Sequence, residues 1–111
     1  MSGTRQSSPG DRRRLANRRA AETFDFECAG QRYTCTVGRF ADDSIGELFL
    51  DSFKSNSTAD TSARDSAITF SIAVQHGANP EVIRHALCRD AQGRAMGPLA
   101  TALDLLEGDR P

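Results

Sequence analysis

The spacing of the apolar residues changes near residue 55, from every second residue to every third or fourth. Before this point, two runs that begin at Phe24 and Tyr33 alternate between apolar and polar residues. A period of two is typical of strands that bury one face. After it, the following residues fall on one face of a helix: Ala59, Ala63, Ala67, Phe70 and Val74. The chain is therefore expected to adopt an α+β fold, with a sheet followed by helices.

Three strands are expected, at about residues 22–29, 31–40 and 45–52. A turn containing Gly30 separates the first two strands, and the turn-forming sequence ADDS at residues 41–44 separates the last two. Short turns of this kind join antiparallel neighbours, so the simplest arrangement is a three-stranded antiparallel meander. Gly46, inside the third strand, predicts either a bulge or a close backbone approach.

Two to three α-helices are expected to pack on this meander, at about residues 57–76, 80–89 and 98–107. Ser57 is a suitable N-cap for the first helix, and Gly77 is a suitable left-handed residue after its last turn. Pro80 and Pro98 stand at positions where a helix tolerates proline. The sheet and the helices are expected to share one core, formed by the following residues: Phe24, Phe26, Tyr33, Val37, Leu48, Leu50, Phe70, Ile72, Val74, Val82, Leu87, Leu99 and Leu103.

Positive charge is concentrated at the N-terminus. Residues 1–20 carry six Arg and one Asp, a charge of +5, whereas the other 91 residues carry eight basic and fourteen acidic residues, a charge of −6. We expect residues 1–14 to be a disordered basic arm and residues 15–108 to be a single domain. An arm of this kind predicts an anionic partner, nucleic acid included; the alternatives are pairing with the chain's own acidic domain and simple solvation of the terminus. The arginines concerned are Arg12, Arg13, Arg14, Arg18 and Arg19.

The sequence lacks the signals of a membrane or secreted protein. It has no run of 18 apolar residues and no apolar segment typical of a signal peptide, so a cytoplasmic location is expected. Cys28, Cys35 and Cys88 do not form a metal-binding spacing with each other or with His76 and His85, and are expected to act as small core residues. Neither a catalytic nor a metal-binding residue is predicted.

The start of the first helix, at residues 54–58, is the one candidate ligand site. Free backbone N–H groups at a helix start attract anions, and Lys54 would add positive charge. The residues that would bind a phosphate or a nucleotide are Lys54, Ser55, Ser57 and Thr58. However, the spacing is not that of a phosphate-binding P-loop, and three nearby acids (Asp51, Asp60 and Asp65) would repel an anion. A cap formed by Ser57 alone also explains the pattern, so both interpretations stay open.

Several stretches together resemble the TSCPD domain family, a module found near the C-terminus of adenosylcobalamin-dependent (class II) ribonucleotide reductases and also as small stand-alone proteins. The matching stretches are RRRLANRR, TVGRFADDSIGELFL, Lys54 with Ser57 and Thr58, DSAITFSIAVQHG followed by Pro80, and Gly97 with Pro98. They span about residues 12–106, nearly the whole of the expected domain. Asp43 replaces a turn glycine common in the family, and His76 replaces the usual Tyr.

The resemblance implies an accessory or regulatory module related to ribonucleoside-diphosphate reductase, which binds nucleotide phosphates or the reductase itself. The catalytic barrel and redox cysteines of the large enzymes have no counterpart in these 111 residues. We therefore do not expect the chain to reduce ribonucleotides alone, and expect adenosylcobalamin to belong to the full-length reductases and not to this chain. The alternative is a non-enzymatic module that binds protein or RNA and has no connection with nucleotide reduction.

Overall fold

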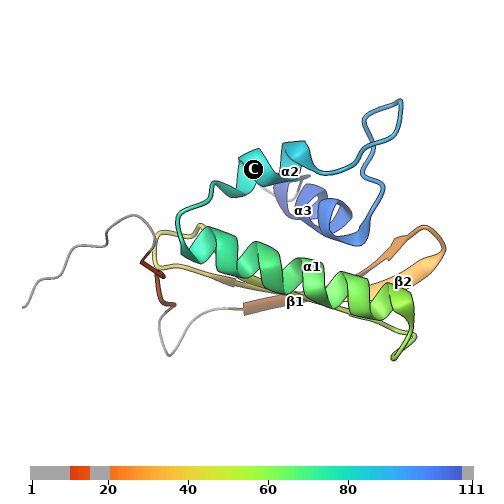
Figure 1. Cartoon of the computed structure of the whole chain (residues 1–111), viewed down its shortest axis with the longest axis horizontal. Coiled ribbons are helices and arrows are strands. Elements are labelled where there is room, and N and C mark those ends of the chain that lie inside the picture. The colour runs from red at the N-terminus through yellow and green to blue at the C-terminus, as the bar shows by residue number, and fades with distance from the viewer. Residues whose placement is uncertain (1–10, 16–20, 109–111) are drawn as a thin grey trace, which may run out of the picture.

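The computed structural model describes residues 11–15 and 21–108 of the chain. Three strands are followed by three helices: β1 (Ala21–Cys28), β2 (Gln31–Arg39), β3 (Ile45–Ser52), α1 (Thr58–Gln75), α2 (Pro80–Ala86) and α3 (Pro98–Gly108) (Figure 1). The α+β class and the change from strands to helices near residue 55 are confirmed. Residues 1–10, which make up most of the expected arm, and residues 16–20, which include Arg18 and Arg19, lie outside the described residues.

The sheet is the expected antiparallel meander, in the order β1-β2-β3. Ala29 and Gly30 form a two-residue turn between β1 and β2, and both have positive φ, as a tight hairpin of this twist requires. In the β2–β3 pairing, Gly38 faces Glu47 but Arg39 faces Ile45, so Gly46 is an extra residue in β3. A Cβ atom built on Gly46 would lie only 3.1 Å from a side-chain carbon of Phe40. The predicted bulge is therefore confirmed, whereas the close neighbour of this glycine is a side chain and not a backbone segment.

Helix α1 lies along β3, the strand with which it makes its most extensive contact. Its side chains form hydrogen bonds with the edge of β3 that a fourth strand would otherwise form. The Ser71 hydroxyl accepts a hydrogen bond from Leu48 N at 2.8 Å and donates to Leu48 O at 3.0 Å. Toward one end of β3, Asp60 Oδ1 accepts from Ser52 N at 2.9 Å. Toward the other, Gln75 Nε2 donates 2.8 Å to the carbonyl of the bulge residue in β3. Because these polar side chains are buried, α1 satisfies backbone groups at an edge that would otherwise be open to another strand.

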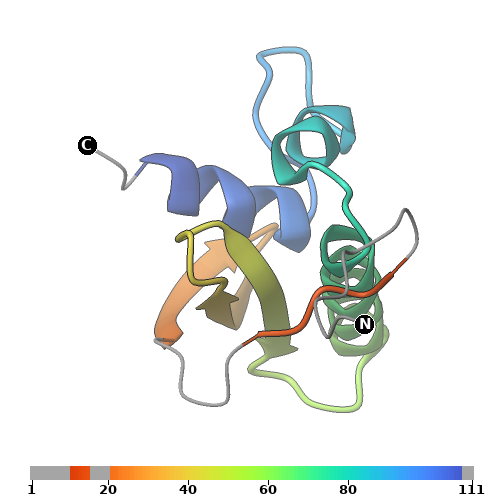
Figure 2. The same ribbon diagram turned by 90° about the vertical axis from the view of Figure 1, so that its left-hand side faces the viewer.

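Small residues allow this close approach. Ala63 and Ala67 lie between the polar partners on α1 and are almost fully buried. The sequence placed these alanines on one face of the helix, and the neighbour of that face is β3. Figure 2, which views α1 nearly end-on, shows the helix beside the sheet and α3 across one face of it. The strands bury that face because their apolar side chains alternate.

The core contains most of the expected residues, and five of its members come from β2 and β3: Tyr33, Cys35, Val37, Leu48 and Leu50. Two expected members are wrong. Ile72 is 43% exposed, because α1 turns its buried face toward the edge of β3 and Ile72 lies outside that face. Val82 is 65% exposed, because the short helix α2 buries none of its residues. Phe24 and Leu87 are only partly buried and pack against the core.

Both ends of α1 have the expected capping residues. Ser57 Oγ accepts a hydrogen bond from Asp60 N at 3.1 Å and is the N-cap. At the C-terminal end Gly77 has φ +103°, and the amides of Gly77 and Ala78 donate to Val74 O and Ala73 O. This is the double hydrogen-bond pattern of a Schellman motif, which ends the helix at a glycine.

Candidate functional site

The predicted anion site at the start of α1 is an exposed loop. Lys54, Ser55 and Thr58 are exposed, and Ser57 is partly buried. The Ser57 hydroxyl donates to Lys54 O at 2.8 Å while it accepts from the helix, so it acts in capping. The capping interpretation is confirmed, and anion binding by the loop stays a prediction. Asp60, expected to repel an anion, is turned inward with only 4% of its surface exposed.

Part of the expected arm lies against the domain at the opposite end of α1. The guanidinium of Arg13 lies 3.8 Å from the centre of the Phe40 ring and 3.2 Å from Asp42 Oδ2. Arg12 Nε donates to Gln75 Oε1, and Arg13 N donates to Gln75 O. For Arg13 the structure thus bears out one alternative, pairing with the acidic domain. The Arg14 side chain is exposed.

The acid that Arg13 pairs with is itself held in the charged form. The hydroxyl and the backbone amide of Ser44 donate to Asp42 Oδ1, and with a smaller contribution from Arg13 they lower the pKa of Asp42 to about 2. The β2–β3 turn thus presents a fixed negative charge to the arginine.

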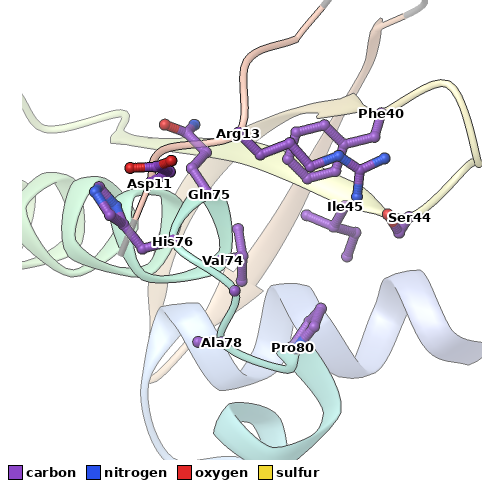
Figure 3. Close-up of a pocket in the computed structure, with 11 residues that line it drawn as sticks. Asp11, Arg13, Phe40, Ser44, Ile45, Val74, Gln75, His76, Ala78 and Pro80 are labelled. Atoms are coloured by element: carbon purple, nitrogen blue, oxygen red, sulfur yellow. The ribbon is translucent and has the colours of Figure 1, made fainter. Parts of the chain in front are cut away.

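A pocket of about 460 Å³ opens where this N-terminal segment crosses the end of α1 (Figure 3). Its walls come from four parts of the chain: Asp11 and Arg13 of the segment; Phe40, Ser44 and Ile45 around the β2–β3 turn; Val74, Gln75, His76 and Gly77 at the end of α1; and Ala78 and Pro80. Sequence reasoning did not predict this pocket, because its walls are as much as 69 residues apart in the chain, from Asp11 to Pro80.

The pocket combines an apolar floor with a few polar groups. Ile45, Val74 and Pro80 supply the apolar surface, whereas Arg13 supplies a cation. His76 Nδ1 lies 3.0 Å from the carbonyl oxygen of Ile72. Because a carbonyl can only accept, the ring nitrogen is the donor, which leaves Nε2 as the second polar atom of the ring. This combination of an apolar surface and a few oriented polar groups is typical of small-molecule sites.

Gln75 holds the pocket together and was missed at the sequence level. Its amide nitrogen binds the β3 carbonyl of Gly46, while its two oxygens accept from Arg12 and Arg13. The signal that could have found it is a polar residue four positions after Ser71 on the buried side of the helix. A buried amide at such a position has to find partners, and here they are the carbonyl of Gly46 and the guanidinium of Arg12.

A second cluster of charges is structural. Asp104 of α3 binds Arg84 Nη1 through Oδ1 and Arg89 Nη1 through Oδ2, both at 2.8 Å. Hydrogen bonding by Arg89 and then Arg84 lowers the pKa of Asp104 to about 2. Arg89 also pairs with Ala95 in a short bridge, so the cluster fastens the loop before α3 to the helix.

The cysteines differ from one another in their surroundings. Cys35 lies fully in the core, as expected, and burial raises its pKa to about 12. Cys28 is partly buried, and Cys88 is exposed, which corrects its expected place in the core. Cys88 follows the short helix α2, where the chain has already left the core. Within residues 11–15 and 21–108, no group of three His, Cys, Asp or Glu side chains is arranged to hold a metal ion. None of the helices described is long and apolar enough to cross a membrane.

Comparison with known proteins identifies no relative of this chain. No family model matches the chain, and neither a curated protein nor a solved structure matches it significantly. The resemblance to the TSCPD family therefore depends on the sequence motifs alone.

Proposed function

We propose that this chain is a stand-alone module of the TSCPD type, a cytoplasmic accessory protein in deoxyribonucleotide synthesis. In this role it binds nucleotide phosphates or a ribonucleoside-diphosphate reductase, and the chemistry of reduction belongs to the large enzyme with its adenosylcobalamin.

One observation carries the proposal. Three of the stretches on which the resemblance depends, separated in sequence, meet at the 460 Å³ pocket. Arg13 comes from RRRLANRR, Phe40, Ser44 and Ile45 come from TVGRFADDSIGELFL, and Val74 comes from DSAITFSIAVQHG. The resemblance therefore includes residues that line this pocket.

The pocket has a size and a chemistry that suit a nucleotide. Its volume lies within the range of about 300–1,000 Å³ that is usual for small-molecule sites. The apolar floor would contact a base, and the planar guanidinium of Arg13, about half exposed, is a group that recognises phosphate. Asp42 competes for this cation, so weak binding that declines with added salt is expected.

A titration can separate the pocket from the start of α1. The helix has 18 residues and is about 27 Å long at 1.5 Å per residue. A ligand bound at one end is therefore expected to shift the amide resonances of that end and not those of the other. Addition of a nucleoside diphosphate is expected to shift the amide resonances of Ser44 and Gly77, and Arg13→Ala should abolish these shifts. Arg14→Ala is the matched control, since Arg14 is exposed.

Shifts confined to residues 55–59 and removed by Lys54→Ala would move the site to the helix start. If the amide resonances of neither region shift at about 10 mM nucleoside diphosphate, nucleotide binding is refuted. For the protein partner, the measurement is capture from the native cell extract: recovery of a reductase subunit supports the accessory role.

A second candidate is a module that binds RNA or protein and is unconnected with nucleotide reduction. Arg14 favours it, because this cation, next to Arg13 in the chain, is exposed and would be available to a polyanion. Capture of ribosomal or RNA-bound partners, with no reductase subunit, would favour this candidate over the first.

A further inference from the structure

An apolar surface lies along α1 and β3, on the side away from the core. Phe49 of β3 is 44% exposed, and Ile68 and Ile72 of α1 are 48% and 43% exposed. The two isoleucines are four residues apart, hence neighbours on one face of the helix. Phe49 and Ile68 line the same groove, of about 330 Å³, between the strand and the helix. We call Phe49, Ile68 and Ile72 the α1–β3 surface.

This surface does not arise from the packing of the domain. The buried side of α1 is already used by its hydrogen bonds to the edge of β3 and by Phe70 and Val74, which enter the core. Large apolar side chains gathered on an exposed face mark an interaction site more often than single ones do. The neighbouring exposed positions on α1, Asp65 and Thr69, are polar, as is usual for a helix face in contact with water.

The charges in the groove indicate what fits it. Asp51 and Arg64 line it together, and their side chains lie 3.8 Å apart, each about 60% exposed. Arg64 also lies 3.7 Å from Asp60. An extended acidic or basic segment would meet one favourable and one unfavourable charge. A second copy related by two-fold symmetry meets only favourable charges. A symmetry axis that passes between the two residues places Arg64 of each copy opposite Asp51 of the other.

We propose that the α1–β3 surface is the interface of a symmetric homodimer. The apolar side chains of the two copies pack against each other at its centre, and two reciprocal Asp51–Arg64 pairs flank them. The partner is a second copy of this chain because the surface is complementary to itself in both apolar character and charge.

The first test is the mass of the purified full chain, measured by light scattering and sedimentation over a range of concentrations. The expected result is a dimer of twice 12.0 kDa. Ile68→Glu is expected to weaken association roughly tenfold or more, because it places a charge at the centre of the interface. Val82→Glu is the matched control: Val82 is also exposed, at 65%, but lies on α2, so this variant should dimerise normally. A wild-type mass of 12.0 kDa at millimolar concentration would overturn the proposal.

Charge reversal tests the symmetry itself. Asp51→Lys alone places two lysines opposite the two arginines, and Arg64→Glu alone places four acids together, so each variant should be monomeric. Mixed, the two variants should form a heterodimer, because each lysine then faces a glutamate and each arginine an aspartate. Thermal unfolding checks that both variants fold, since Arg64 also neighbours the buried Asp60; if Arg64→Glu does not fold, Arg64→Ala replaces it and should weaken the dimer. Single variants that dimerise like the wild type, or a mixture that stays monomeric, would refute the two-fold interface.

Discussion

Ser71→Ala is the sharpest test of the way α1 covers the sheet. The Ser71 hydroxyl is buried and lies within hydrogen-bond distance of three backbone groups: it accepts from Leu48 N at 2.8 Å, and donates toward Leu48 O at 3.0 Å and Ala67 O at 2.8 Å. Leu48 itself is completely buried, so water cannot replace the lost partner. The substitution therefore leaves the N–H and the C=O of Leu48 without this partner at the edge of β3.

The magnitude follows from these groups. A buried polar group that loses its partner costs about 1–3 kcal/mol. Alanine is a better helix former than serine, which raises the free energy of unfolding by roughly 0.5 kcal/mol and offsets part of this loss. The expected net loss is about 2 kcal/mol, which in a domain of this size lowers the melting temperature by roughly 8–16 °C.

The assay is thermal and urea unfolding followed by circular dichroism. Ser66→Ala is the matched control on the same helix, because the Ser66 hydroxyl donates only to Ala63 O, at 2.9 Å, in its own helix. This variant should change the free energy of unfolding by less than about 0.5 kcal/mol. Equal melting temperatures for the two variants would show that Ser71 does not support the edge of β3.

Three further predictions concern the cap, the core and the pH dependence. Ser57→Ala should lower the free energy of unfolding by about 1 kcal/mol, whereas Lys54→Ala should change it little; urea unfolding of both variants checks this. Phe70→Ala should cost roughly 3–5 kcal/mol, and Ile72→Ala much less, because only the first is buried; similar melting temperatures would contradict this assignment. The pKa of Asp104 is lowered to about 2 in the folded state, so its stabilising effect is present above pH 4 and is lost as the pH falls toward 2. Unfolding midpoints measured from pH 6 to pH 2 should therefore decrease more steeply for the wild type than for Asp104→Asn.

The local structure could be predicted from the sequence because its causes are local. Alternation of apolar and polar residues predicts the strands, since successive side chains of a strand point to opposite faces. Ser57 and Gly77 mark the two ends of α1 because each provides a backbone conformation or a hydrogen bond that a helix end requires. The three strands and three helices accordingly lie within a few residues of their expected positions.

The candidate site was much less predictable. The capping role of Ser57 could be foreseen from its neighbours, but the pocket at the other end of α1 could not. Arg13 and Phe40 meet there from segments 27 residues apart, and Gln75 joins them from a third segment. Which of several arginines finds an aromatic ring or an acid depends on how the segments are placed in space, and periodicity contains no information about that placement.

The sequence by itself determined the order of the elements, their types and their ends. Only the tertiary structure decided which polar side chains of α1 join its buried side, because that depends on the partner. The face predicted from apolar periodicity is buried, as Ala63, Ala67 and Phe70 show. The backbone groups at the edge of β3 also required the polar side chains of Asp60, Ser71 and Gln75 to turn inward. Leaving those groups unpaired in the interior costs more than exposing part of two isoleucines, so the helix turns its polar residues toward the strand and Ile68 and Ile72 toward solvent.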